Sequence, residues 1–322
     1  MTWLLTGGAG YIGAHVLRSL QASGRKVVVL DDLSSGLARK VPVGVPLVQA
    51  DICDRASVET ALVEHGVTGV IHLAAKKAVG ESVERPHHYY RQNVDGALAL
   101  TEAMVDAGVS RLVYSSSAAV YGAVDVDLVL ESTPTLPVSP YGETKLIGEW
   151  VGRDLATAAG LSVVALRYFN VAGAGADDLG DTSAFNIIPM VFRAHERGDR
   201  PQIFGDDYPT PDGTCVRDYI HVVDLADAHV AAAAGTEAGE PGFTAYNIGR
   251  GVGSSVREVL DSVGRALGEE LAVDVVERRP GDPARLVASA ELASTGLGWT
   301  AARDLDSMTS SAWSAFTAYP PS

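Results

Sequence analysis

Short apolar runs alternate with helical segments through the first half of the chain, and this alternation restricts the fold more than any other feature. The segments between the runs are long enough to form crossover helices. Such alternation predicts a parallel sheet with helices on both faces, that is, a doubly wound α/β fold that binds ligands beyond the carboxyl ends of its strands. The predicted strands cover residues 3–6, 26–30, 46–50, 69–72, 111–115 and 162–167.

The composition and pattern of the sequence change after Asn170. Gly, Ala and Asp dominate an irregular stretch at 173–182, whereas 224–234 has a helical pattern and 245–248 a strand pattern, which indicate a return of the chain to the first domain. A last helix is predicted over 305–319. We therefore expect a first domain of residues 1–172 with a return segment at about 220–248, and a smaller mixed α/β C-terminal lobe of residues 173–219 and 249–322.

A glycine-rich loop, Thr6-Gly-Gly-Ala-Gly-Tyr-Ile-Gly13, follows the first predicted strand and opens a helix that extends through Leu20. Gly8, Gly10 and Gly13 satisfy the G-x-G-x-x-G spacing, and Gly7 extends it. This spacing allows a tight turn, a close approach of the backbone to a pyrophosphate, and an anion at the helix N-terminus. The loop therefore predicts a dinucleotide-binding site of the Rossmann type.

Acidic residues follow the second and third predicted strands. Asp31 lies 18 residues after Gly13, where a carboxylate accepts hydrogen bonds from an adenosine ribose. Asp32 follows it and no arginine occurs before Arg39, so a ribose 2′-phosphate would be repelled and NAD is favoured over NADP. Asp51 and Ile52 are placed to contact the adenine; a helix N-cap is the alternative role for Asp51.

Tyr141 and Lys145 stand four residues apart in a predicted helix and therefore share one face. A tyrosine titrates near pH ~10, so its use as a base at neutral pH requires its pKa to fall by ~3 units, or ~4 kcal/mol. An ammonium ~5 Å away supplies ~3 kcal/mol at an effective dielectric of ~20. Ser115, Ser116 and Ser117 close the fifth strand, and Ser117 could share a substrate hydroxyl with Tyr141.

Composition excludes several classes of partner. The net charge of −15, with no cluster of cations, argues against binding to nucleic acid or anionic lipid, and no run of 18 apolar residues predicts a membrane span. The chain opens without a basic signal-peptide region, and Cys53 and Cys215 form no CxxC motif. We expect a cytoplasmic protein with free thiols and no metal centre.

The glycine loop together with Ser117, Tyr141 and Lys145 resembles the short-chain dehydrogenase/reductase superfamily, in its extended, nucleotide-sugar branch. Four further motifs narrow the resemblance to the UDP-glucose 4-epimerases and spread it over nearly the whole chain. They are Lys77-Ala-Val-Gly-Glu-Ser82, Ser115-Ser-Ser-Ala-Ala-Val-Tyr-Gly122, Leu166-Arg-Tyr-Phe-Asn170 and Gly213-Thr-Cys-Val-Arg-Asp-Tyr-Ile-His-Val222.

The resemblance implies NAD-dependent, reversible epimerisation at C4 of UDP-glucose and UDP-galactose through a 4-keto intermediate. Ala118 and Ala119 stand where related dehydratases and decarboxylases carry acid–base residues, so elimination is disfavoured. Leu286 replaces a tyrosine that restricts the sugar pocket in some members, which suggests that UDP-GlcNAc and UDP-GalNAc are also accepted. Two alternatives stay open, namely an epimerase of another UDP sugar (a uronate or pentose) and a non-catalytic NAD-binding regulator.

The resemblance also implies roles for individual residues and an oligomeric state. Ser117, Tyr141 and Lys145 would be catalytic, and helices over residues 86–107 and 140–159 would form a homodimer interface. The expected substrate contacts are Lys77, Ser117, Tyr141, Phe169, Asn170, Asn186, Arg217, Tyr219, Arg279 and Asp282. The expected NAD contacts are Gly7, Gly10, Tyr11, Ile12, Gly13, Asp31, Asp32, Asp51, Ile52, Leu73, Ala74, Ala75, Lys77, Asn93, Ser115, Tyr141, Lys145 and Tyr168.

Overall fold

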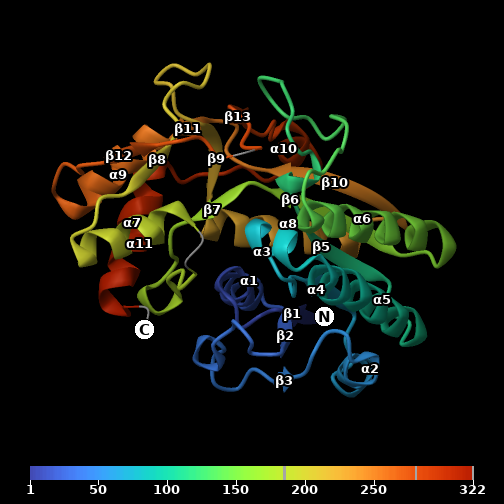
Figure 1. Cartoon of the computed structure of the whole chain (residues 1–322). Helices are drawn as coiled ribbons and strands as arrows, with labels where there is room; N and C mark the ends of the chain where they lie inside the picture. The colour runs from blue at the N-terminus through green and yellow to red at the C-terminus, as the bar shows by residue number, and fades with distance from the viewer. Residues whose placement is uncertain (184–185, 280, 321–322) are drawn as a thin grey trace.

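A parallel sheet of seven strands forms the centre of the first lobe in our computed structural model, which describes residues 1–183, 186–279 and 281–320 (Figure 1). The six strands predicted from the apolar runs are all present, and a seventh joins them from the second half of the chain. Every pairing in the sheet is parallel, which confirms the doubly wound α/β fold. In spatial order the strands are β10 (Gly242–Ile248), β6 (Ser162–Tyr168), β5 (Arg111–Ser117), β4 (Gly69–His72), β1 (Thr2–Thr6), β2 (Lys26–Asp31) and β3 (Leu47–Gln49).

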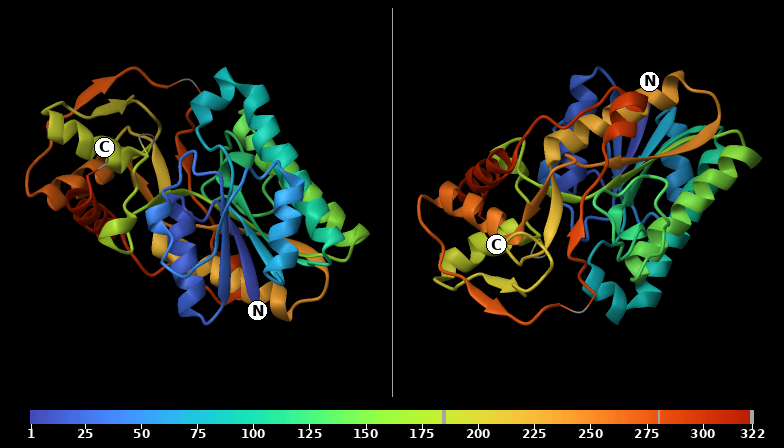
Figure 2. Two further views of the ribbon diagram at one scale, coloured as in Figure 1. Left: turned by 90° about the horizontal axis from the view of Figure 1, so that it is seen from below. Right: turned by 90° about the horizontal axis from the view of Figure 1, so that it is seen from above.

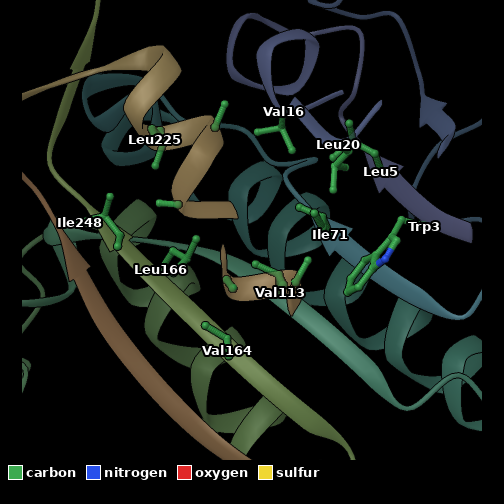
Figure 3. Close-up of a cluster of buried hydrophobic side chains, with 14 of the residues drawn as sticks. Trp3, Leu5, Val16, Leu20, Ile71, Val113, Val164, Leu166, Leu225 and Ile248 are labelled. Atoms are coloured by element: carbon green, nitrogen blue, oxygen red, sulfur yellow. The ribbon is translucent and has the colours of Figure 1, made fainter. Parts of the chain in front are cut away.

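Helices cover both faces of this sheet because its strands present apolar side chains in both directions. In β1, Trp3 and Leu5 point to one face, where they join a buried cluster with α1 (Tyr11–Ala22) and α8 (Val222–Ala238) (Figure 3). Leu4 points to the other face and joins a second cluster. The helices that cover this second face are α2 (Arg55–Glu64), α5 (Gly96–Asp106) and α6 (Pro140–Ala158).

The smaller lobe is built around its own strands and core. A four-stranded sheet centres on β9 (Val216–His221), which pairs with β7 (Asn170–Ala172), β11 (Gly253–Ser255) and β13 (Arg285–Leu286), and β8 (Gln202–Phe204) pairs with β12 (Asp274–Val276). The lobe lies to one side of the main sheet (Figure 2). Its helices are α7 (Ile187–Arg197), α9 (Val256–Leu267) and α11 (Leu305–Ala318), whose apolar faces share one buried cluster. α10 (Glu291–Leu297) packs instead against the first lobe.

The helix predicted over residues 86–107 is interrupted. It consists of α4 (Pro86–Tyr89), a π-helical segment (Tyr90–Asp95) and α5, and a short helix, α3 (Val79–Glu84), precedes it. The π-helical segment carries the buried Asn93. Its side chain accepts a hydrogen bond from the Lys76 amide, and it donates to the Lys76 carbonyl and to Thr144 Oγ1, the latter at 3.0 Å. Such insertions are frequent at functional sites because they redirect one side chain. Here the insertion ties the loop after β4 to α6.

Candidate active site

A cleft of about 470 Å³ lies beyond the carboxyl ends of β1, β2 and β4, the position that a doubly wound sheet offers to a nucleotide. Most of the predicted cofactor contacts line this cleft. They are Gly7, Gly10, Tyr11, Ile12, Gly13, Asp31, Asp32, Ile52, Leu73, Ala74, Ala75, Lys77, Tyr141, Lys145 and Tyr168.

The glycine loop brings backbone close to the cleft in a way that larger residues would prevent. Gly7 has a φ of 71°, in the left-handed region that favours glycine. A Cβ added at Gly13 would lie 2.1 Å from the carbonyl oxygen of Gly7, and one at Gly10 would lie 3.3 Å from it. Gly10 is also the N-cap of α1, so unpaired amides of the first turn face the cleft. This cradle fits a pyrophosphate at a helix N-terminus.

Asp31 is buried and held by the loop itself. Its two carboxylate oxygens accept hydrogen bonds from the amides of Ala9 and Leu33, both at 2.9 Å, while burial raises its pKa. Asp32 beside it is more exposed. Burial opposes ionisation of Asp32, but hydrogen bonds from Ser34 outweigh that effect and leave its pKa lowered. Each Asp31 oxygen keeps a second lone pair, which a ribose hydroxyl could use.

A cation that the sequence interpretation missed lies beside this acidic pair. The Lys76 ammonium is 3.8 Å from Asp32 Oδ2 and donates to Ser34 Oγ at 2.8 Å. The sequence around Asp31 does not indicate this cation, because Lys76 lies on the loop after β4. The adjacent Lys77 is exposed and lines the same cleft.

Three predicted cofactor contacts lie outside the cleft lining. Asp51 is exposed and accepts from the amide of Cys53 at 2.9 Å; the alternative role as N-cap was wrong, because Asp54 caps α2. Asn93 and Ser115 are buried behind the lining. The Ser115 hydroxyl bonds to the hydroxyl of Tyr168 at 2.5 Å, so it supports a side chain that does line the cleft.

Tyr141 and Lys145 line the cleft, whereas Ser117 lies near Tyr141 outside the lining. α6 begins at Pro140 because Ser139 caps it, and it places Tyr141 and Lys145 on one buried face. The Lys145 ammonium donates to the carbonyl of Ser115 at 2.7 Å and lies 6.0 Å from the Tyr141 ring centre. Ser117, at the end of β5, lies near the Tyr141 side chain and accepts from the amide of Ala119 at 3.1 Å.

The protonation equilibria at this site differ from the sequence-based expectation. Burial raises the pKa of Tyr141, and the hydrogen bond with Ser117 opposes that rise. Burial lowers the pKa of Lys145 to about 8. Helical spacing gives the position of the Lys145 charge but not the cost of removing both groups from water.

A buried ion pair next to the site was not predicted. Glu149, one turn beyond Lys145 on α6, accepts from Arg167 Nε at 2.9 Å and from Arg167 Nη2 at 2.6 Å. Both side chains are under 10% exposed. Ser116 donates to Glu149, so the pair connects α6, β5 and β6 behind the catalytic face. The four-residue spacing of Glu149 from Lys145 indicated that they share a helix face. Arg167, however, lies in an apolar strand pattern, and nothing in that pattern indicated that it would pair with Glu149.

The predicted substrate contacts divide into groups. Arg217 Nη2 pairs with Asp282 Oδ1 at 3.2 Å, and Arg279 places its guanidinium 3.7 Å from the centre of the Phe204 ring. Asn170, Asn186 and Tyr219 line a small pocket that adjoins the cleft, since Tyr11, Asp181 and Thr182 line both. Phe169 is buried in a separate cluster with Ala118, and Leu286 packs against that cluster.

Within the described parts of the chain, no group of three His, Cys, Asp or Glu side chains is arranged to hold a metal ion. The described helices also include none with the length and apolar character needed to cross a membrane.

Comparison with known proteins decides the family. Residues 3–249 match the sequence profile of the NAD dependent epimerase/dehydratase family. The chain belongs to this family. Its relatives in the family include the UDP-glucose 4-epimerase of Azospirillum brasilense, 46% identical over 97% of this chain and 90% of the relative. The UDP-glucose 4-epimerase of Corynebacterium glutamicum is 44% identical, with 98% and 96% covered.

Solved structures of the epimerase/dehydratase family superpose closely on this chain. A UDP-glucose 4-epimerase from Stenotrophomonas maltophila, crystallised with NAD and formylated UDP-arabinopyranose, matches with a TM-score of 0.95 and 42% identity over 99% of this chain and 98% of that one. The predicted resemblance to UDP-glucose 4-epimerases is therefore confirmed. NAD is confirmed as the cofactor by the family, and the glycine cradle with Asp31 fits it.

Proposed function

We propose that this protein interconverts UDP-glucose and UDP-galactose by inverting C4 through a 4-keto intermediate. The observation that carries the proposal is the position of Tyr141 and Lys145 in the lining of the cleft that fits NAD, with Ser117 near Tyr141. Bound NAD supplies the hydride acceptor and donor at C4. The residues of the chain position the sugar and move the proton of its 4-hydroxyl.

Tyr141 takes this proton and later returns it. Ser117 lies near the tyrosine hydroxyl, where it would orient the sugar hydroxyl toward Tyr141. The ammonium of Lys145, fixed by the Ser115 carbonyl, favours the phenolate while the proton is away. Because burial raises the pKa of Tyr141, its phenolate is a strong enough base to take the proton from the sugar hydroxyl. The C4 oxygen takes the proton back when the ketone is reduced, because an alkoxide is a stronger base than a phenolate.

The side chains next to Ser117 support a reaction that ends with epimerisation. Ala118 is buried and Ala119 partly buried in the 3₁₀ turn (Ala118–Val120) that follows β5. Their methyl groups carry no proton to deliver, so water elimination from the ketone has no acid or base at this position. An NAD-binding regulator would need the cleft but not this buried tyrosine–lysine pair, which favours the enzyme over that alternative.

The test is replacement of Tyr141 by phenylalanine. We expect Tyr141→Phe to keep its NAD and to lose ~100-fold or more in the conversion of UDP-galactose to UDP-glucose, as removal of a general base does. Tyr246→Phe is the matched control, because that buried tyrosine lies on β10 and outside the cleft lining. Tyr141→Phe turning over at the wild-type rate would refute the assigned role.

We further propose that the UDP moiety is held by the substrate lobe. The Arg217 guanidinium pairs with Asp282 and is only 13% exposed, so a pyrophosphate would meet an oriented cation. Asn170 bonds to Tyr219 on the neighbouring strand, and Arg279 approaches from the segment after β12. These contacts support a division into an NAD-binding domain (1–172 with about 220–248) and a UDP-sugar-binding domain (173–219 and 249–322).

A specific observation supports acceptance of UDP-GlcNAc and UDP-GalNAc. Leu286 on β13 is paired in register with Arg217 and packs against the cluster that contains Phe169, so it borders the proposed sugar site. We expect the wild type to turn over UDP-GlcNAc and UDP-glucose at comparable rates. We expect Leu286→Tyr to lose activity toward UDP-GlcNAc only. Absence of GlcNAc epimerisation by the wild type would refute it. UDP-uronates and UDP-pentoses assayed in parallel test the alternative that another UDP sugar is the substrate.

The remaining proposals concern assembly and location. Leu98 and Val105 on α5 and Trp150 on α6 are 39%, 42% and 46% exposed, and these apolar side chains support a homodimer formed through the two helices. Trp150→Glu is expected to halve the mass measured by light scattering. Free Cys53 and Cys215 support a cytoplasmic location.

A further inference from the structure

Residues 173–183, here called the strap, cross from the substrate lobe to the wall of the cofactor cleft. The strap follows β7, contains a 3₁₀ turn (Asp177–Leu179), and ends before α7. Its last residues, Asp181, Thr182 and Ser183, line the cleft together with residues of the glycine loop. The Ser183 hydroxyl is buried and has no hydrogen-bond partner among the described residues. A polar group of the strap is therefore available to a ligand in the cleft.

One face of α1 fastens the first half of the strap. Tyr11 donates from its hydroxyl to the Gly173 carbonyl at 2.5 Å, and His15 Nε2 accepts from the Gly175 amide at 2.8 Å. Burial lowers the pKa of His15 to about 4, which keeps this nitrogen unprotonated and able to accept. One turn further, Arg18 pairs with Asp178 at 2.5 Å. The same helix whose N-terminus faces the cleft therefore also holds the strap.

Lys40 fastens the second half of the strap. It ends a 3₁₀ turn (Ala38–Lys40) after β2, is only 3% exposed, and donates from its ammonium to the Gly180 carbonyl at 2.9 Å. Burial lowers the pKa of Lys40 to about 8, and the nearby Asp181 carboxylate opposes this effect. A lysine is rarely buried without a partner, and this one reaches the residue immediately before the cleft lining.

Helix α11 holds the other side of the strap. Ser311 Oγ accepts from the Ala174 amide at 3.2 Å, and Ser314 donates to Asp177 at 2.8 Å. These contacts end at Asp177. Beyond it, Asn186 donates to Asp181 at 2.5 Å and Arg193 donates to the Thr182 carbonyl at 2.8 Å, so the substrate lobe also holds the part that lines the cleft, and Lys40 is its contact with the first domain. Among the described residues of the strap, Gly180 is the last one whose backbone accepts a hydrogen bond from a side chain of the first domain.

We propose that Lys40 is a positioning residue that retains NAD, because it holds Gly180 and thereby keeps Asp181, Thr182 and Ser183 across the mouth of the cleft. Loss of the Lys40 contact then loosens this segment and speeds the dissociation of NAD. The inference rests on the proposed function only in that NAD occupies this cleft. Retention suits an epimerase, since the reaction returns the cofactor to its starting state and no exchange is needed.

The experiment measures NAD dissociation without any sugar. NAD-loaded wild type, Lys40→Met and Arg39→Met are diluted into buffer that contains an NAD-hydrolysing enzyme, and the NAD still bound is quantified after denaturation. We expect Lys40→Met to lose NAD about tenfold faster or more, the change that losing one charge-assisted hydrogen bond produces. Arg39→Met removes the same charge from the same turn at an exposed position and should match the wild type.

Equal dissociation rates in folded Lys40→Met and the wild type would overturn the inference, as would equal acceleration in Arg39→Met. If Lys40→Met does not fold, Arg18→Met decides, because it releases the strap from a pair that is 39% and 42% exposed. It should accelerate NAD loss, and an unchanged rate would refute the strap. Wild type that retains NAD but epimerises no UDP sugar would refute the proposed function and leave this inference standing.

Discussion

Replacing Glu149 by glutamine should destabilise the protein more than any exposed charge replacement. Glu149 receives two hydrogen bonds from Arg167, and the Arg167 guanidinium also donates to the Tyr121 hydroxyl at 2.9 Å and to the Glu131 carbonyl at 3.2 Å. Burial alone would lower the pKa of Arg167, but its pairing with Glu149 raises it. In Glu149→Gln this cation stays buried and faces an amide that offers only one acceptor oxygen.

The magnitude follows from that geometry. Breaking a buried pair by removing one partner costs about 3–5 kcal/mol, a large share of the 5–15 kcal/mol by which domains are usually stable. At about 1.5 °C for each kcal/mol in a chain of 322 residues, the melting temperature should fall by about 4–7 °C. Replacing both partners with apolar residues, as in Glu149→Leu with Arg167→Met, should recover part of the loss because no charge is then left in the interior.

The assay is thermal or urea unfolding of NAD-loaded protein followed by circular dichroism. Asp199→Asn is the matched control, since it breaks a pair with Arg197 in which both side chains are about 60% exposed. We expect this control to shift the free energy of unfolding by less than about 1 kcal/mol. A Glu149→Gln variant within 1 kcal/mol of the wild type would refute the reasoning, and so would a double variant less stable than the single one.

Two further predictions concern cofactor binding and pH. Gly13→Ala should abolish NAD retention, because its Cβ would lie 2.1 Å from the Gly7 carbonyl; normal NAD content after gel filtration would contradict this. His229 is buried, and burial lowers its pKa to about 4. The unfolded imidazole gains a proton near pH 6.5 whereas the folded one does not until about pH 4, so stability should fall by up to about 3 kcal/mol as the pH drops through this window. His229→Leu should lessen that fall and exposed His87→Gln should not, as urea titrations between pH 4 and 7 would show.

The sheet could be predicted because parallel strands are buried on both faces and leave continuous apolar runs in the sequence. The glycine loop could also be predicted, since the backbone geometry at Gly7 and Gly13 excludes other residues. The π-helical segment Tyr90–Asp95 was not, because residues 87–95 contain neither proline nor glycine to mark a change in the helix.

The candidate site was predictable where its residues are neighbours in sequence and obscure where they are not. Tyr141 and Lys145 lie on one helix, so their spacing places them on one face. Lys40 and Gly180 are 140 residues apart, and nothing in a single lysine indicates that it will be buried. The pairing of Glu149 with Arg167 likewise depends on how α6 packs on the sheet.

The most direct test of the account follows the hydrogen at C4. Purified protein is given UDP-galactose deuterated at C4, without added NAD, and the UDP-glucose formed is analysed by mass spectrometry and NMR. We predict product that keeps its deuterium at C4, because the hydride taken from the substrate returns to the same carbon while Tyr141 exchanges only the hydroxyl proton. Product that has lost its deuterium, or a requirement for added NAD at every turnover, would contradict the account.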